Sequence, residues 1–169
     1  MPLNVTTKYT KERILRFNHA YALSRKFILI FMAVDTLLML LLNIITAFGD
    51  TFIKYALFLV LALDLLLVFM FFGLPYLLVG KNKAIDAVVE YVFDDEEFTV
   101  SMATKDISQT STAKYTTLFK VLKKGSELYL FIAPRQAYIV DLSVMADADI
   151  ARLKGTINKF VAPKKFKWR

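Results

Sequence analysis

The 169-residue chain is 57% apolar and 22% charged, carries a formal net charge of +7 and contains no cysteine. Soluble domains average about 45–50% apolar residues, so this composition exceeds that of an ordinary soluble domain and excludes a disordered chain. The lack of cysteine excludes disulfides, thiol catalysis and thiolate metal sites, and the single histidine leaves little imidazole chemistry. We therefore expect a small membrane protein.

Residues 1–26 form a basic N-terminal segment. Side chains alternate in polarity over residues 3–9, which predicts a short extended stretch, and Thr10 can cap the helix that follows. The side chains at helical spacing on that helix are Ile14, Phe17 and Tyr21.

Two interpretations of this helix are open. Either it lies on the membrane surface with its cations on lipid headgroups, or its aromatic stripe packs on the C-terminal domain. The cations concerned are Lys11, Arg13, Arg16 and Arg25. The stretch 3–9 can also add a strand to the C-terminal sheet, and the membrane helices would then be an insertion within one fold.

Two long apolar segments follow, at residues 27–48 and 52–79. Each exceeds the ~18 apolar residues that indicate a bilayer-spanning helix. Residues 49–51 separate them, so we expect an antiparallel transmembrane hairpin with a short extracytoplasmic turn. A signal peptide fits poorly, because the apolar stretch is longer than an h-region of ~7–15 residues.

Basic residues flank the hairpin on the side of both termini, whereas its tip has only Asp50 and the nearby Lys54. Because positive flanks stay in the cytoplasm, we expect a multi-pass protein of the cytoplasmic membrane with both termini inside. The flanking cations are Lys8, Lys11, Arg13, Arg16, Arg25 and Lys26 before the hairpin, and Lys81 and Lys83 after it.

After a linker at residues 80–87, the hydrophobic period changes to two. Short strands separated by turn residues predict an antiparallel meander. The strands are expected at 88–93, 98–103, 107–112, 115–124, 127–133 and 136–141. Asp147 can cap an amphipathic helix that Pro163 ends, so residues 88–162 predict an α+β cytoplasmic domain whose helix covers one sheet face.

Several aromatic motifs of this domain resemble a known family. They are Tyr91, Phe93 and Phe98; Tyr115, Leu118, Lys120 and Val121; and the segments 129–132 and 136–140. With two spans and a very short turn, they resemble the YcxB-like family of small bacterial membrane proteins. The resemblance implies a cytoplasmic domain of pleckstrin-homology-like, split-barrel type and implies no activity. The segment 141–145 departs from the family's basic residue and Phe, which weakens any inference about a shared ligand surface.

Asp35 and Asp64 are the most informative polar residues, because a carboxylate inside a span costs ~2.5–3.5 kcal/mol. Both lie ~20 Å from the turn at ~1.5 Å per residue, so they match in depth on adjacent helices. Three interpretations are open. The two acids can join the hairpin or a dimer as protonated hydrogen-bonding groups, with Thr36 and Asn43 assisting. They can form a proton or cation relay, or they can contact a larger membrane partner.

The tail, residues 163–169, interleaves cations with aromatic rings and suits the headgroups of an anionic inner leaflet, at ~1 kcal/mol per basic residue. The residues expected to contact lipid are Lys164, Lys165, Lys167, Trp168 and Arg169. Nucleic acid is disfavoured, because the domain is tethered to a membrane and the charge is confined to a short tail.

A second basic set, Lys123, Lys124 and Arg135, is placed near predicted loops. It forms either a loop anion site or simply the solvated ends of strands.

No catalytic residue is predicted. The acidic run 94–97 lacks the spacing of a calcium loop and is expected to be a solvated turn, and His19 has no partner at motif spacing. No nucleotide-binding, hydrolase or metal-site motif occurs, so we expect no enzyme activity, no metal and no cofactor.

The sequence therefore predicts a binding protein. The first hypothesis is an adaptor or accessory subunit that presents the β domain to a protein partner at the inner leaflet, with homo-oligomerisation through the hairpin as an option. The alternative is a small transport or proton-linked component that uses Asp35 and Asp64.

Overall fold

The computed structural model describes residues 2–24, 26–47, 49–103 and 108–168. The chain divides into two compact units. Residues 1–17 and 82–169 form the β unit, and residues 18–81 form the hairpin unit. The hairpin unit is therefore an insertion in the sequence of the β unit, and the boundary falls within the first helix rather than at residue 26.

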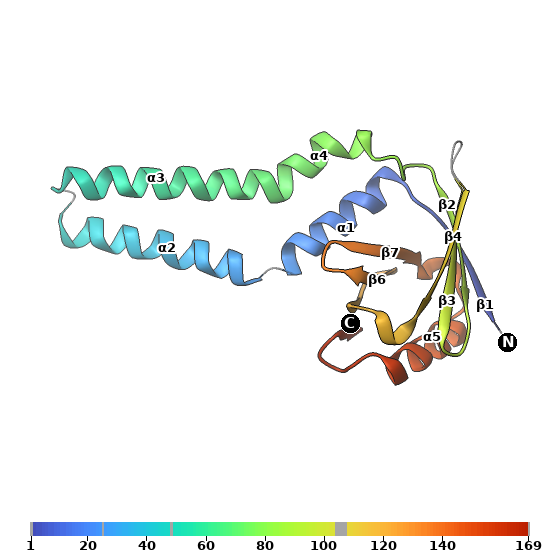
Figure 1. Ribbon diagram of the computed structural model, residues 1–169. Coiled ribbons are helices and arrows are strands. Elements are labelled where there is room, and N and C mark those ends of the chain that lie inside the picture. The colour runs from blue at the N-terminus through green and yellow to red at the C-terminus, as the bar shows by residue number, and fades with distance from the viewer. Residues whose placement is uncertain (1, 25, 48, 104–107, 169) are drawn as a thin grey trace. The chain divides into compact units, whose positions relative to one another are not determined.

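Sheet A of the β unit is an antiparallel meander (Figure 1). Its strands, in spatial order, are β1 (Leu3–Lys8), β2 (Val88–Phe93), β3 (Glu97–Ala103) and β4 (Ser108–Lys114). β1 pairs with β2 over its whole length, from Leu3 opposite Phe93 to Lys8 opposite Val88. The expectation that the N-terminal stretch adds a strand to the C-terminal fold is thus confirmed.

The residues expected as a linker, 80–87, belong largely to the β unit. Tyr9 donates its backbone N–H to the Ala87 carbonyl at 2.9 Å, and Asp86 donates its N–H to the Tyr9 carbonyl at 2.8 Å. Ala87 is fully buried. The two segments of the β unit that precede and follow the insertion are therefore joined by backbone hydrogen bonds immediately beside the β1–β2 pair.

Sheet B consists of β5 (Lys120–Lys124), β6 (Glu127–Ala133), β7 (Gln136–Asp141) and β8 (Phe166–Trp168), in the spatial order β7-β6-β5-β8. β5, β6 and β7 are antiparallel, whereas β8 runs parallel to β5. Every residue of β6 from Glu127 to Phe131 is buried, so both faces of this strand are covered. Sheet B is therefore the centre of the β unit.

The single strand expected at 115–124 is wrong. The chain forms a 3-10 turn, η3 (Tyr115–Thr117), before β5 begins at Lys120. Tyr115 is fully buried, stacks on Phe98 and donates its hydroxyl to the Asp94 carbonyl at 3.0 Å. These contacts fix the turn at which the chain passes from sheet A to sheet B.

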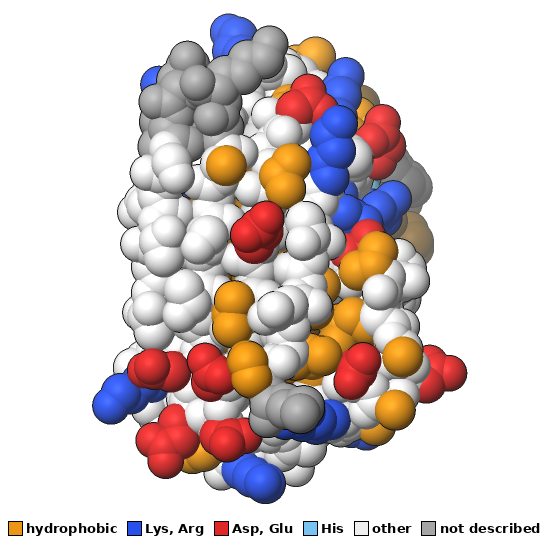
Figure 2. Space-filling view, turned by 90° about the vertical axis from the view of Figure 1, so that its right-hand side faces the viewer, with side chains coloured by type: hydrophobic (Ala, Val, Ile, Leu, Met, Phe, Trp, Pro, Cys, Tyr) orange, Lys and Arg blue, Asp and Glu red, His pale blue; other side chains and the backbone are white. Residues whose placement is uncertain are grey.

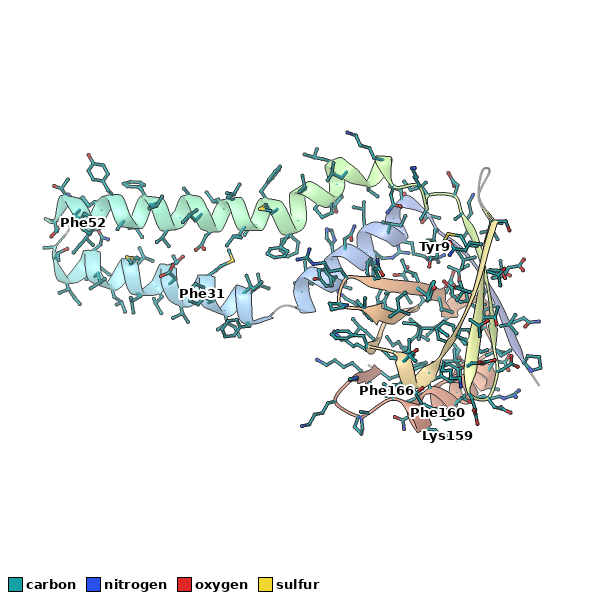
Figure 3. The ribbon with its side chains drawn as sticks, viewed as in Figure 1. Tyr9, Phe31, Phe52, Lys159, Phe160 and Phe166 are labelled. Carbon is teal, nitrogen blue, oxygen red and sulfur yellow. The ribbon has the colours of Figure 1, made fainter. Side chains whose placement is uncertain are left out.

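Helix α5 (Asp147–Phe160) packs on the β unit through Leu153 and Ile157, and Phe160 at its end stacks on Tyr115 (Figure 3). Its N-cap is Ala146 rather than the expected Asp147. Asp147 lies in the first turn, where its charge still complements the helix dipole.

Helix α1 (Lys11–Ser24) begins as expected, because the Thr10 hydroxyl accepts the Arg13 backbone N–H at 3.3 Å. Within the β unit, Ile14 is buried and the Phe17 ring contacts the rings of Tyr129 and Phe131 at 5.5 and 5.8 Å. Of the two interpretations of this helix, packing on the C-terminal domain is confirmed for residues 11–17.

The hairpin unit contains two helices long and apolar enough to cross a membrane, Phe27–Ile45 and Thr51–Lys81. α2 (Lys26–Ile45) and α3 (Thr51–Val68) run side by side in opposite directions (Figure 1). The connection is longer than the expected 49–51, because α2 already ends at Ile45. Asp50 caps α3 by accepting the N–H groups of Phe52 and Ile53 at 2.8 and 3.1 Å.

The second apolar helix is not uniform. A π-helical turn, η1 (Phe69–Gly73), precedes α4 (Leu74–Leu78) and the 3-10 turn η2 (Val79–Lys81). Pro75 lacks an N–H and its ring would clash with the carbonyl four residues earlier, which the wider turn accommodates. Gly73 is required here because a Cβ would lie 2.6 Å from the Phe69 ring.

The outer face of sheet A is polar. Thr99 and Thr112 share a hydroxyl hydrogen bond across β3 and β4, as do Ser101 and Thr110, both at 3.1 Å. Figure 2 shows few hydrophobic side chains on the left part of this view, more of them toward the lower right, and a gathering of acidic side chains along the lower edge. The expected turn at 94–97 joins β2 to β3, with Asp94 donating its N–H to the Glu97 carbonyl at 2.9 Å.

Candidate functional site

The β unit has a groove of about 590 Å³ that is lined by α1, β3, β6 and β7 and by the segments that follow β1 and precede β2. This volume falls within the range of about 300–1,000 Å³ that is typical of ligand pockets. The apolar lining includes Ile14, Phe17, Ala84, Met102, Ile132, Ala137 and Ile139. The polar lining consists of Tyr9, Asn82, Arg135, Gln136 and Tyr138.

A closed ring of hydrogen bonds fixes one wall of this groove. Ile139 donates its N–H to the Tyr9 hydroxyl at 2.8 Å, and the Tyr91 hydroxyl donates to the Ile139 carbonyl at 2.9 Å. Because Tyr91 has only one hydroxyl proton, Tyr9 must be the donor in the 2.9 Å bond between the two hydroxyls. Burial raises the pKa of both tyrosines, so the ring stays neutral and intact at ordinary pH. Figure 3 labels Tyr9 at this position.

A buried ionic cluster holds α1 on sheet B. Glu127, only 3% exposed, accepts hydrogen bonds on one oxygen from Arg13 Nε at 3.1 Å and from Arg16 Nη2 at 2.7 Å. Its other oxygen accepts the Tyr129 hydroxyl at 2.5 Å. The buried carboxylate is thus fully partnered, which is the condition under which a buried charge is tolerated.

Asp141 completes this cluster. Its Oδ2 accepts Arg13 Nη2 at 2.5 Å, and its Oδ1 accepts both the N–H and the hydroxyl of Ser143. Burial by itself raises the pKa of Asp141, but the Ser143 hydrogen bonds and the Arg13 charge outweigh it and hold the pKa below its ordinary value. Arg13 therefore bridges two carboxylates that lie more than a hundred residues away in the sequence.

The cluster corrects one expectation about the N-terminal cations. Arg13 and Arg16, expected as headgroup contacts in one interpretation of α1, are engaged with carboxylates of sheet B. Arg13 is only 13% exposed. No local pattern in the sequence indicates these pairs, because the acids lie on β6 and β7.

In the hairpin unit, a polar contact joins the two apolar helices. The Thr36 hydroxyl donates to Asp64 Oδ2 at 2.6 Å, and the Asn43 amide donates to the Ile53 carbonyl at 3.3 Å. The less exposed positions of α3 recur at three- and four-residue intervals, as in Ile53, Leu57, Val60, Asp64 and Leu67. Asp64 therefore lies within the seam between the helices.

Asp35 occupies a different position from Asp64. Because successive residues of an α-helix are rotated by about 100°, the side chain before Thr36 points to the flank of the seam. Asp35 is nevertheless half-buried. The sequence predicts that Asp35 and Asp64 lie at the same depth, and the hydrogen bond from Thr36, the residue next to Asp35, agrees with this. The donor to Asp64 is therefore Thr36 rather than Asp35.

The basic tail is part of sheet B. β8 pairs with β5 so that Lys167 lies opposite Leu122, and Val121 donates its N–H to the Lys165 carbonyl at 2.9 Å. Lys167 therefore shares a sheet face with Lys120, whose pKa is lowered by burial and by the charge of Lys167. Lys164 precedes the strand, Trp168 ends it, and Arg169 lies outside the described residues.

The structure does not bring Lys123, Lys124 and Arg135 together. Lys123 and Lys124 lie at the β5–β6 turn, whereas Arg135 lies at the β6–β7 turn. These turns are at opposite ends of β6, whose seven residues span about 20 Å. A loop anion site made from these three residues is therefore wrong, and Arg135 belongs to the groove instead.

Within the described ranges, no group of three or more His, Cys, Asp or Glu side chains could hold a metal ion. The His19 ring packs between Phe72 and Tyr76 of the hairpin unit at 5.9 and 5.3 Å.

Comparisons with family models, with curated proteins and with solved structures found no match to this chain. The resemblance to the YcxB-like family stays a prediction.

Proposed function

We propose that the protein is a membrane-anchored adaptor of the cytoplasmic membrane that binds a protein partner through the groove of its β unit. The hairpin unit would span the bilayer with both termini in the cytoplasm. The β unit would be of the pleckstrin-homology-like, split-barrel type, a proposal supported by two successive meanders followed by α5.

The exposure of the hairpin supports membrane insertion. In the most apolar part of the helix Phe27–Ile45, only 11% of the residues are buried within the protein. In the most apolar part of Thr51–Lys81, none is buried. Large apolar side chains such as Phe31 and Phe52 are exposed on these helices (Figure 3). Apolar surface on this scale requires a membrane or a partner to cover it.

The observation that carries the binding function is the groove. It is large enough for a ligand, mainly apolar, and lined by Phe17 and Asn82, which adjoin the two ends of the hairpin unit in the sequence. The β unit is joined to the hairpin unit at both ends of the insertion in the sequence, so it would be tethered to the proposed spans. A partner held there would be recruited to the inner leaflet.

The lysines of sheet B suit a second contact, with anionic lipid headgroups. Lys120 and Lys167 share a face, and the exposed Lys164 and Lys165 precede β8. Each cation near an anionic leaflet contributes about 1 kcal/mol at low salt. We assign this face a supporting role in holding the β unit on the membrane.

The alternative, a transport or proton-linked component, would use Asp35 and Asp64. The bond between Thr36 and Asp64 favours a structural role for Asp64, because it satisfies the carboxyl within the hairpin. Proton flux in reconstituted vesicles that is lost in Asp64→Asn would instead support the alternative.

Membrane topology can be tested cleanly because the chain has no cysteine. Single cysteines at Asn4, Thr51 and Thr112, all exposed positions, would be labelled in intact cells with a membrane-impermeant maleimide. We expect labelling of Thr51→Cys from outside, and labelling of the other two only after permeabilisation. Labelling of Thr112→Cys in intact cells would contradict the proposal.

Partner binding can be tested with a photocrosslinking amino acid at Ile132, which lines the groove and is 39% exposed. The matched control is Val144, which is exposed but lies outside the groove. We expect a discrete protein adduct in native membranes from position 132 only, and its loss when Ala137→Trp fills the groove. Identical adducts from both positions would argue against a specific groove partner.

A further inference from the structure

The free edge of β7 is only partly covered. In an antiparallel strand, the backbone groups of alternate residues point toward the neighbouring strand and away from it. The Ile139 and Asp141 N–H groups point away from β6, because they donate to the Tyr9 hydroxyl at 2.8 Å and to Thr7 Oγ1 at 3.0 Å. Side chains from the N-terminal segment therefore occupy this stretch of the edge.

At Ala137, two residues before Ile139, the outer edge of β7 is open. The same alternation directs the N–H and C=O of Ala137 away from β6, and Ala137 lines the groove. β7 is the outer strand of sheet B on this side, so no other strand of the described chain pairs with these two groups. An unpaired strand edge beside an apolar groove is the arrangement to which extended peptides add as an extra strand.

The charge of the residues that line the groove restricts the chemistry of the ligand further. Among the described residues that line the groove there is Arg135 but no Asp or Glu, so a ligand carboxylate would meet a cation there. The apolar walls from α1 and β6, with Phe17 and Ile132, can take an aliphatic or aromatic side chain.

We propose that the groove binds an extended peptide segment that pairs with β7 at Ala137, places an acidic residue at Arg135 and inserts an apolar side chain between α1 and β6. This inference rests on the proposed function and specifies its partner. A peptide residue supplies both a donor and an acceptor for Ala137, whereas the acyl chains and ester groups of a lipid supply no donor. Because Tyr9 and Thr7 occupy the edge beyond Ala137, strand pairing is short and the side-chain pocket carries much of the selectivity.

The test uses the full chain in phosphatidylcholine nanodiscs and a phage-displayed library of random twelve-residue peptides. We expect enrichment of peptides that combine an acidic residue with a nearby apolar one. Ala137→Pro removes the N–H at a position where an edge strand tolerates proline, and Ala137→Ser keeps the N–H as the matched control. We expect Ala137→Pro to weaken binding of a selected peptide about tenfold and Ala137→Ser to leave it nearly unchanged.

A second variant keeps the proposal testable if Ala137→Pro fails to fold. Arg135 is exposed, and we expect Arg135→Glu to shift the selected peptides from acidic to basic. An unchanged preference in Arg135→Glu, or equal binding by folded Ala137→Pro, overturns the proposed pairing mode. Absence of any enriched peptide while the Ile132 adduct persists overturns this inference alone. Loss of the adduct as well overturns the proposed function.

Discussion

At the residue scale, Arg13 is the central cation of the buried ionic cluster in the β unit. It is nearly buried and bridges Glu127 and Asp141, and its Nη1 also donates to the Lys8 carbonyl at 2.7 Å. One guanidinium thus connects the end of β1, the start of α1 and two strands of sheet B. Removing one partner of such a cluster leaves a buried charge without compensation, which costs more than the cluster contributes.

Glu127→Gln tests this cluster. We expect a loss of about 3 kcal/mol in the free energy of unfolding, because Arg13 and Arg16 keep their charges while their shared carboxylate is gone. Glu90→Gln on the exposed face of sheet A is the control and should change stability by less than about 0.5 kcal/mol. Denaturant unfolding of the detergent-solubilised protein, followed by Trp168 fluorescence, measures both. Equal effects in the two variants would show that the cluster contributes nothing specific.

Asp141 makes stability depend on acid pH. Its pKa is lower in the folded protein than its ordinary value of 3.8, so its contribution is fully present above that value and is lost as pH falls through the folded pKa. We therefore expect the melting temperature of the wild type to fall more steeply below pH 3.8 than that of Asp141→Asn. Parallel curves for the two proteins in that range would contradict this assignment.

At the element scale, the hairpin depends on few polar contacts between apolar helices. Interhelical hydrogen bonds in membranes average about 0.6 kcal/mol and reach about 1.7 kcal/mol. If the hairpin spans the bilayer as proposed, this range applies to the bond between Thr36 and Asp64, which is 2.6 Å long.

Thr36→Val should therefore weaken the α2–α3 pair by about 1 kcal/mol. Thr46→Val is a matched control, since among the described residues the Thr46 hydroxyl, just after the end of α2, bonds to the Leu42 and Asn43 carbonyls of α2 and not to α3. Steric trapping of the hairpin in bicelles would measure the difference. A larger effect from Thr46→Val would place the important contact at the turn instead.

Elements with a strong local pattern were predictable, and elements defined by distant partners were not. The apolar runs gave both long helices, and alternation gave β2, β6 and β7 nearly to the residue. The tail was expected as a basic and aromatic segment on lipid headgroups, and its pairing with β5 through Phe166–Trp168 was not expected, because a three-residue strand has too few positions to show a period. The groove and the Arg13 cluster were missed for a related reason: Tyr9, Arg13 and Ile139 meet only after the chain ends are brought together.

At the scale of the whole molecule, the β unit is assembled from two segments that flank the hairpin unit. Residues 82–169 alone lack β1 and Arg13, so sheet A would lose an edge strand and Glu127 and Asp141 would lose their shared cation. We expect a chain of residues 82–169 to be unfolded or molten by amide NMR.

Adding a peptide of residues 2–17 in trans should restore dispersed spectra, because it supplies both the strand and the cation. The same peptide carrying Arg13→Gln should restore them much less. A well-dispersed spectrum of residues 82–169 without peptide would show that the N-terminal segment is dispensable.

The insertion also sets the order of events during synthesis. The first seventeen residues leave the ribosome long before any strand that can pair with them, and the whole hairpin must be made in between. In the proposed topology, β1 and β2 can pair only when the chain has crossed the membrane twice and returned to the compartment in which it started. If only one of the two apolar helices were inserted, β1 and β2 would lie on opposite sides of the bilayer, so formation of sheet A would require correct insertion of both helices.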